Sequence, residues 1–444
     1  MSNKISWLAG LGFLVCSFPQ CLAAQQYGVS AHTLSNGTRI LVHEDHDIPD
    51  AVLTLFFRIG SRNERPGITG ISHFFEHMMF NGARKYGPKQ FDIVMERNGG
   101  SNNAYTAHDV TVYTDWFPSD RLELIMGMEA DRIQYLSFDP KMVESERNVV
   151  RNERLMKVDN RNSGLLLEQL EATAFLVHPY RRPVLGWAAD INAWTVQDLE
   201  TQFHKGYAPN NCVLVAAGDV TDAEVLRLAK EYFERIPSHE PPPPVRVREP
   251  EQLGERRVLL RRPAELPLEY FAYHVPPTNG PEHPAVSVLA SVLAAGASSR
   301  LSRRLVDRDQ LALSVSHWNE ISLDPGLLVF SIQPKSGVDP ERVERAFRQE
   351  VARVRQGGIT AKELEKAKNE LLTSHFERMK TNSGFAELLG EYEIYFGDYR
   401  RLFTAAQEME RVSAADVRRA ADRYLTSKNL TVATLIPEKQ ETSE

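Results

Sequence analysis

The sequence contains very little cysteine. Of its three cysteines, Cys16 and Cys21 lie in an N-terminal apolar segment that we expect to be removed, which leaves Cys212. A single cysteine can form no internal disulfide and cannot build a cysteine cluster around a metal. Any metal bound by the mature chain must therefore use histidine and carboxylate side chains.

The sequence also lacks an excess of basic residues, and its formal net charge is -7. A protein that holds a polyanion presents a basic surface, so we expect no nucleic-acid partner. The composition is otherwise that of a globular protein, with 42% hydrophobic and 25% charged residues. The 444 residues are too many for one compact core, and a usual size of roughly 100–200 residues per domain predicts two to four domains.

The apolar run at the N-terminus is short for a membrane span. The segment ISWLAGLGFLVCSF follows Lys4 and is broken by Pro19, and it is shorter than the roughly 20 residues that cross a bilayer. Small residues in CLAAQQ offer a cleavage site, and no arginine of a mitochondrial presequence occurs before Arg39. An uncleaved anchor is the alternative, but we predict a signal peptide at 1–24, no stable membrane span and a periplasmic location.

A proline-rich stretch divides the mature chain into two pieces of similar size. Four consecutive prolines at 241–244 favour an extended spacer over a helix or strand. We therefore predict an N-terminal domain at 27–236, a linker at 237–256 and a C-terminal domain at 257–438. Each piece has the pattern of β-strands followed by helices.

The two pieces also resemble each other. TVQDLETQFHKGYAPNNCVLVAAGDV near the end of the first corresponds to SAADVRRAADRYLTSKNLTVATLIPE near the end of the second. Asp198 and Asn211 are thirteen residues apart, as are Asp416 and Asn429. Chance similarity between two α+β segments is the alternative, but the paired spacings favour a true duplication.

A polar cluster interrupts one apolar helical segment. GISHFFEHMMFNGARK places His73, Glu76 and His77 in a run that is otherwise apolar. The corresponding segment of the second half, AVSVLASVLAAGASSRL, has no histidine or glutamate in that helix. The helix as a structure therefore does not require these polar side chains.

The spacing of the cluster matches a metal site. Residues 73 and 77 are four apart and share one face of a helix, so both imidazoles can bind one Zn²⁺ at roughly 2.0–2.1 Å. Glu76 is close enough to reach a water at the metal, and H-x-x-E-H is the inverted zinc-protease motif. Polar decoration of a core helix is the alternative, but an unpaired buried polar group costs ~1–3 kcal/mol, which favours a shared metal.

A catalytic zinc ion needs a third protein ligand. The charged segment FDPKMVESERNVVRNERLMKVDN begins a helix at Asp139 and Pro140. Within it, Glu146 and Glu153 are seven residues apart and share one helical face. Spacing alone does not choose between these two glutamates.

A strand pattern lies between the two helices. After Gly99 and Gly100, AYTAHDVTVYTDWF alternates as a β-strand does. An exposed strand beside a metal could bind peptides as an added strand, with little demand on their sequence. The alternative is a strand inside the sheet. His108 in this segment is not expected to bind metal, because nothing pairs with it at a useful spacing.

Three motifs occur in the order HFFEH, NNAYT and ERNVVRNE. With them the chain resembles the pitrilysin/insulinase family of inverted-motif zinc peptidases, over about residues 28 to 437. The resemblance implies an α+β fold of two duplicated domains, each a mostly antiparallel sheet packed with helices. Together these domains form one half of a clamshell that closes around a peptide.

The resemblance also implies roles for individual residues. Two histidines and a glutamate about 76 residues after the second one bind zinc in that family, which selects Glu153 over Glu146 here. One zinc ion per chain would then be held by His73, His77 and Glu153. By the same resemblance, Glu146 supports the site, Glu76 is the general base, and Asn103, Ala104 and Tyr105 lie on the strand that pairs with substrate.

One departure from the family concerns the partner. Active homodimeric relatives carry an arginine and a tyrosine, seven residues apart, in the second domain. The corresponding positions here are Val306 and Leu313, both apolar. The chain thus resembles the zinc-bearing subunit of heterodimeric members, and we expect a homologous subunit without zinc as its partner, with a homodimer as the alternative.

These features predict a zinc-dependent endopeptidase that hydrolyses peptides or unfolded polypeptide segments in a closed chamber, with water activated by zinc and Glu76. The alternative is a non-catalytic structural or peptide-binding subunit of a larger complex. A third hypothesis is a processing factor that acts on one dedicated precursor.

Overall fold

A computed structural model describes residues 28–438, and the predicted signal peptide lies outside the described residues. Between α9 (Asp222–Tyr232) and β7 (Arg256–Pro263) the chain forms no helix or strand. The domain boundaries at 236 and 257 stay a prediction, with the proline-rich stretch between them. Among the described residues, no helix has both the length and the apolar character that crossing a bilayer requires.

The first sheet has six strands in the order β1-β2-β6-β3-β5-β4. All neighbours are antiparallel except the parallel pair β2 and β6. The edge opposite β1 is therefore formed by β4, which pairs only with β5. The strands are β1 (Val29–Thr33), β2 (Arg39–Glu44), β3 (Asp50–Phe57), β4 (Ser101–Thr106), β5 (Thr111–Pro118) and β6 (Cys212–Gly218).

The second sheet repeats this plan in five strands, ordered β7-β11-β8-β10-β9. In both sheets the last strand of the half inserts beside the first repeated strand and runs parallel to it. The remaining strands are β8 (Leu268–Val275), β9 (Ala312–Asn319), β10 (Gly326–Pro334) and β11 (Leu430–Glu438). The shared strand order confirms the α+β class and the two duplicated, mostly antiparallel domains.

Helices cover the two sheets and connect them. Those of the first half are α2 (Ile71–Met78), α3 (Gln90–Arg97), α4 (Leu122–Tyr135), α5 (Pro140–Arg154), α6 (Asn162–Ala174), α7 (Ala188–Ala193), α8 (Val196–Gly206) and α9. Those of the second half are α10 (His283–Ala294), α11 (Pro340–Gly357), α12 (Ala361–Met379), α13 (Asn382–Tyr395), α14 (Ala405–Glu410) and α15 (Ala414–Tyr424). A π-helical turn, Leu155–Asp159, continues α5.

Local capping explains where several helices begin. The Asp139 side chain accepts hydrogen bonds from the backbone N–H groups of Lys141 and Met142, with Pro140 in the first turn of α5. Reciprocal capping boxes start α8 at Thr195 and α15 at Ser413. The repeated aspartates Asp198 and Asp416 are the third residues of these two helices and complete the boxes, so their equal spacing reflects the same helix start in both halves.

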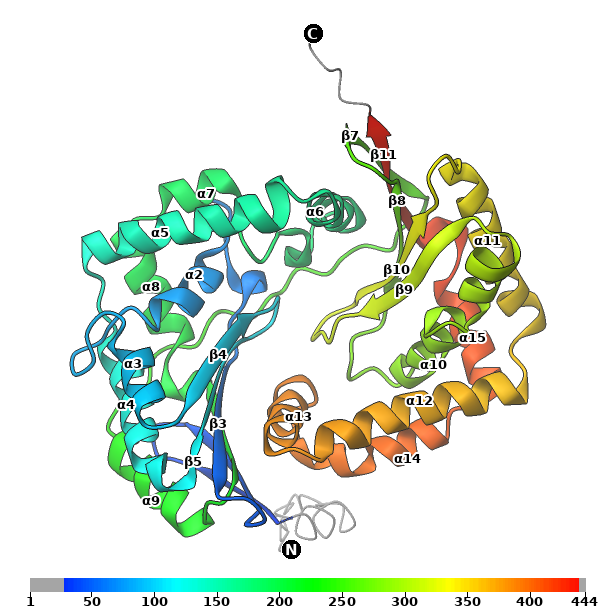
Figure 1. Cartoon of the computed structure of the whole chain (residues 1–444). Helices are drawn as coiled ribbons and strands as arrows, with labels where there is room; N and C mark the ends of the chain where they lie inside the picture. Colours follow the sequence, from blue (N-terminus) through cyan, green and yellow to red (C-terminus); the bar gives the residue numbers. More distant parts are fainter. Residues whose placement is uncertain (1–27, 439–444) are drawn as a thin grey trace, which may run out of the picture.

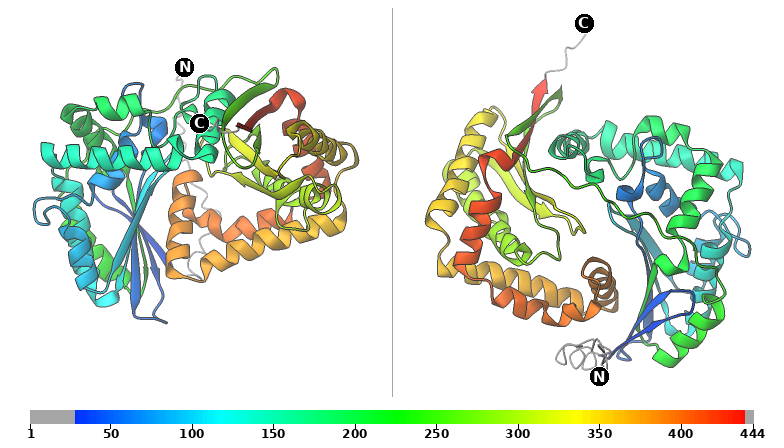
Figure 2. Two further views of the ribbon diagram at one scale, coloured as in Figure 1. Left: turned by 45° about the horizontal axis from the view of Figure 1, so that its top comes forward. Right: turned by 180° about the vertical axis from the view of Figure 1, so that it is seen from behind.

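The two halves exchange one helix each. In Figures 1 and 2, α6 of the first half lies against the second sheet beside β7 and β8, and α13 of the second half lies against β3. Phe385 and Leu389 of α13 are buried on the face of the first sheet with Phe56. A Cβ at Gly390 would lie 2.0 Å from the Phe56 ring, so this position of α13 requires glycine. Burying each large apolar side chain contributes ~1.5–3 kcal/mol, which fixes one half against the other.

Candidate metal centre

The helix α2 begins at a glycine and is capped from a distance. Gly70 has the left-handed backbone (φ +81°) and offers no capping side chain. The buried carboxyl group of Glu64 instead accepts hydrogen bonds from the backbone N–H groups of Gly70 (2.7 Å) and Ser72 (2.8 Å). Burial disfavours the charged form and raises the pKa of Glu64 to about 8. This carboxyl group fixes the start of α2.

One face of α2 enters the apolar core of the first half. Ile71, Phe74, Phe75 and Met78 are fully buried there. Phe74 packs on the Trp194 ring, with ring centroids 5.0 Å apart. The packing of this face directs the polar side chains of the helix toward α5 and the edge of the sheet.

His73, His77 and Glu153 converge, with one ligand atom from each within 4.8 Å of the others. The Glu153 Oε2 atom lies 3.1 Å from His77 Nε2 and 3.4 Å from His73 Nε2. Ligands at ~2.0–2.1 Å in a tetrahedral zinc site are about 3.3–3.4 Å from each other. The two distances to Glu153 therefore fit a zinc site, and the two imidazole nitrogens lie within 4.8 Å of each other.

Glu146 contacts the other side of His77. Its Oε1 lies 2.8 Å from His77 Nδ1, and its Oε2 accepts a hydrogen bond of 2.7 Å from the Asn81 amide. The structure thus places Glu153 beside both histidines and Glu146 beside His77 alone. A carboxylate on the outer nitrogen of an imidazole orients the ring and holds its other nitrogen toward a metal.

The two glutamates and His77 shift each other's proton affinity. Burial lowers the pKa of His77, but hydrogen bonds to Glu146 and Glu153 outweigh this and raise it to about 9. Burial would raise the pKa of each glutamate, and the contacts with histidine instead lower it. Both carboxyl groups are therefore ionised at neutral pH, as ligation and orientation of an imidazole require.

Glu76 lies on α2 between the two histidines and has a different environment. Its side chain is partly buried, and within the described residues no hydrogen bond or ion pair engages its carboxylate. Because no partner holds it, this carboxylate is available to a substrate or a water molecule.

The strand β4 forms the edge of the sheet next to α2. Asn103 and Ala104 pair with Thr114 and Tyr113 of β5, and no other strand of the described part of the chain pairs with their other side. The segment predicted as one strand is instead a hairpin, in which β4 forms the edge while β5, between β3 and β4, is a strand inside the sheet. An open strand edge presents N–H and C=O groups that an extended peptide can pair with.

The side chain of Tyr105 points away from the metal cluster. Its hydroxyl donates a hydrogen bond of 2.5 Å to Glu387 of α13, whereas Ala104 packs against the core beside α2. Successive side chains of a strand point to opposite faces. Tyr105 can therefore meet a peptide only through its backbone.

Sequence reasoning missed two residues of this centre. Asn81 is four residues after His77, so helical spacing could have indicated it. Glu64 lies in the loop before α2, and no periodic pattern connects a loop carboxyl group with the helix that it caps. His108 lies at the turn between β4 and β5, where its Nδ1 is 2.8 Å from Ser61 Oγ.

Comparisons with known proteins show the family to which this chain is similar. Residues 39–187 match the family model described as insulinase (peptidase family M16), and residues 193–371 match the model described as the peptidase M16 inactive domain. The chain is 27% identical to the zinc protease PqqE of Helicobacter pylori, over 91% of this chain and 92% of that protein.

Solved structures share the fold. The crystal structure of a protease from Helicobacter pylori superposes with a TM-score of 0.89 at 26% identity, covering 92% of this chain and 99% of that chain. The periplasmic protease PqqL from Escherichia coli gives a TM-score of 0.78 at 18% identity, covering 93% of this chain but 48% of that chain. The described fold thus corresponds to about half of the larger molecule.

Proposed function

This chain belongs to the insulinase family of peptidases, peptidase family M16, and on that premise we propose that it is a zinc-dependent endopeptidase acting on peptides or unfolded segments. The observation that carries the proposal is the convergence of His73, His77 and Glu153. It is supported by the printed names of relatives, such as the zinc protease of Helicobacter pylori.

His73, His77 and Glu153 are the proposed ligands of one zinc ion per chain. The donor set and its spacing fit this metal. His73 is buried, so solvent would be excluded from that side of the metal site. When bound, zinc supplies Lewis acidity, which polarises a carbonyl oxygen and lowers the pKa of water to about 7. Three protein ligands leave the fourth position to the reactants.

Glu76 and Glu146 have different tasks in this proposal. Glu76, whose carboxylate has no hydrogen-bond or ion-pair partner among residues 28–438, accepts the proton of the water that attacks the peptide carbonyl and returns it to the leaving amine. Glu146 does not touch substrate; it accepts a hydrogen bond from His77 Nδ1 and keeps Nε2 directed at Glu153.

The edge of β4 is the proposed binding place for substrate. A peptide would pair with the backbone at Asn103, Ala104 and Tyr105 as an added strand. Only an extended segment can make this pairing, so folded proteins would be poor substrates. Main-chain hydrogen bonds would also demand little of the peptide sequence.

A second subunit completes the proposed enzyme. The fold corresponds to about half of the Escherichia coli protease. In this proposal one chain forms half of the chamber, and the edge of β4 faces the half that a second subunit would supply. Val306 and Leu313 stand where an arginine and a tyrosine would reach substrate, so a homologous subunit without zinc is the proposed partner. The periplasm is the proposed location, on the strength of the N-terminal segment.

The experiment compares wild type with Glu76→Gln, each assayed alone and with any homologous chain that proves to be encoded beside it. The amide keeps the shape of Glu76 and loses its basicity, so we expect stoichiometric zinc in both proteins and peptide cleavage only in wild type. Cleavage by Glu76→Gln would refute the mechanism. A wild-type chain without zinc would instead support the non-catalytic subunit.

A further inference from the structure

Two glycine backbones touch at the start of α2. Gly70 precedes α2 and Gly186 precedes α7, and both have a left-handed backbone, with φ of +81° and +77°. A Cβ on Gly186 would lie 2.3 Å from the carbonyl oxygen of Thr69, and one on Gly70 would lie 2.5 Å from that of Leu185. No other residue type allows this approach, so the segment around Gly186 fixes where α2 begins.

Thr69 connects the same two segments through its hydroxyl group. The hydroxyl donates a hydrogen bond of 2.7 Å to Asp190 and accepts one of 2.9 Å from the backbone N–H of Trp187. Thr69 is almost fully buried. Its hydroxyl group therefore has both its partners in the segment that contacts α2.

Arg154 extends the connection to α5. It follows Glu153 directly, but its side chain turns away from the metal cluster and donates a hydrogen bond of 2.6 Å to the carbonyl oxygen of Gly186. The same guanidinium group forms a buried ion pair of 2.8 Å with Glu168 of α6. The helix with Glu153 and the helix with the two histidines are thus both attached to Gly186. We call Thr69, Gly70, Arg154 and Gly186 the α2–α5 clamp.

The second half shows whether the fold itself needs such a clamp. Arg154 is fifteen residues after the cap of α5, and His375 is fifteen after Thr360, the cap of α12. Gly186 follows the sequence YRR by four residues, as Ala405 does in the second half. Ala285 corresponds to Gly70 in the aligned helix segments.

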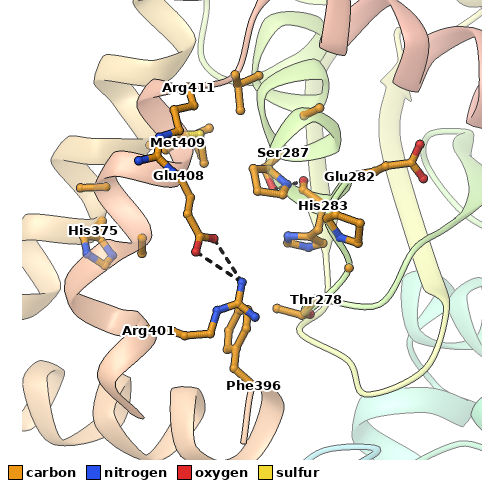
Figure 3. Close-up of a pocket in the computed structure, with 18 of the residues that line it drawn as sticks. Thr278, Glu282, His283, Ser287, His375, Phe396, Arg401, Glu408, Met409 and Arg411 are labelled. Carbon is orange, nitrogen blue, oxygen red and sulfur yellow. Dashed lines mark hydrogen bonds and ion pairs between the residues drawn. The ribbon is translucent and has the colours of Figure 1, made fainter. Parts of the chain in front are cut away.

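These counterparts share the lining of one cavity. His375, Ala405 and Ala285 line a cavity of about 750 Å³ between α10, α12 and α14. Figure 3 shows His375 on one wall and His283 on the opposite one, with Arg401 paired to Glu408 between them. The second half thus keeps the same arrangement of helices with a cavity at the place where the first half has its clamp.

The half that retains the clamp is also the half with the metal cluster. At the positions of His73, Glu76 and His77 the second half has Val288, Ser291 and Val292. We propose that the α2–α5 clamp positions the metal ligands, because it sets the distance from His73 and His77 on α2 to Glu153 on α5. This proposal rests on the proposed function.

The test uses two variants and one matched control in the full chain. Arg154→Met removes the connection from α5, and Thr69→Val removes a single hydroxyl group without changing the shape of the side chain. Arg304→Met is the control, because Arg304 is similarly buried and pairs with Glu350 in the second half. If Arg154→Met does not fold, Thr69→Val carries the test.

Zinc affinity is measured by competition with a chelator, and amide hydrogen exchange of residues 71–74 is measured on the metal-free protein. We expect zinc binding about 10–100-fold weaker in both clamp variants, as for other groups that orient ligands, faster exchange at the start of α2, and neither change in Arg304→Met. Clamp variants that bind zinc as tightly as the control would overturn the proposal. A wild-type chain without zinc would refute the proposed function, and the exchange rates would then decide on the clamp alone.

Discussion

His77 is held between two carboxylates, with Glu146 2.8 Å from Nδ1 and Glu153 3.1 Å from Nε2. The two glutamates lie on the same face of α5, two helical turns apart, and reach opposite nitrogens of one ring. This arrangement gives them separate tasks. The Glu153 carboxylate lies beside the Nε2 atoms of both histidines, and the Glu146 carboxylate orients the His77 imidazole alone.

Replacing Glu153 should abolish zinc binding. Glu153→Ala leaves two ligands, which are too few for a stable site of this type. Metal content after dialysis against trace chelator measures the loss. Glu144→Ala is the control, because Glu144 lies exposed on the same helix and should leave one zinc ion per chain.

Replacing Glu146 should weaken the site without emptying it. In Glu146→Gln the amide can still contact His77, but the negative charge that favours this orientation is lost. We expect zinc affinity to fall roughly 10–100-fold, as for other partners of metal-bound histidines. Competition with a chelator measures the change, and an affinity equal to that of wild type would contradict the orienting role.

The exchange of helices should make one half sensitive to a change in the other. In Gly390→Ala the added methyl group meets the Phe56 ring, and overpacking of this kind costs typically ~1–3 kcal/mol. Denaturant unfolding measures the loss of stability, and zinc content should not change. Gly254→Ala is the control, since a Cβ there meets nothing within 4 Å.

Alkaline pH should destabilise the second half through Glu269. Burial, reinforced by the nearby Glu344, raises the pKa of Glu269 to about 9. The folded state therefore keeps a proton on Glu269 that the unfolded state releases near pH 4.5. The free energy of unfolding is therefore not reduced by Glu269 below pH 4.5, and it falls as the pH rises from 4.5 toward 9.

The variant Glu269→Gln removes this dependence. At pH 8 we expect it to be more stable than wild type by on the order of 5 kcal/mol, and to show little advantage at pH 4.5. Urea unfolding at several pH values measures both. The exposed neighbour Glu265 serves as control, and a Glu265→Gln variant that behaved in the same way would contradict the assignment to Glu269.

Several features of the fold could be predicted without coordinates. The duplication was visible in Asp198 and Asp416, because each is part of a capping box that depends only on neighbouring residues. The exchange of α6 and α13 could not be predicted, because it rests on contacts such as Gly390 with Phe56, which lie far apart in the chain.

Helical periodicity is a local property of the chain, so the sequence alone predicts that His73, Glu76 and His77 share a short helix. It left Glu146 and Glu153 equivalent by spacing, since both lie on one face of α5, and the resemblance alone favoured Glu153. The way in which α5 crosses α2, and therefore which carboxylate lies beside both imidazoles, is seen first in the folded structure. That distance depends on the packing of two helices and on contacts such as that of Arg154 with Gly186, which no local pattern encodes.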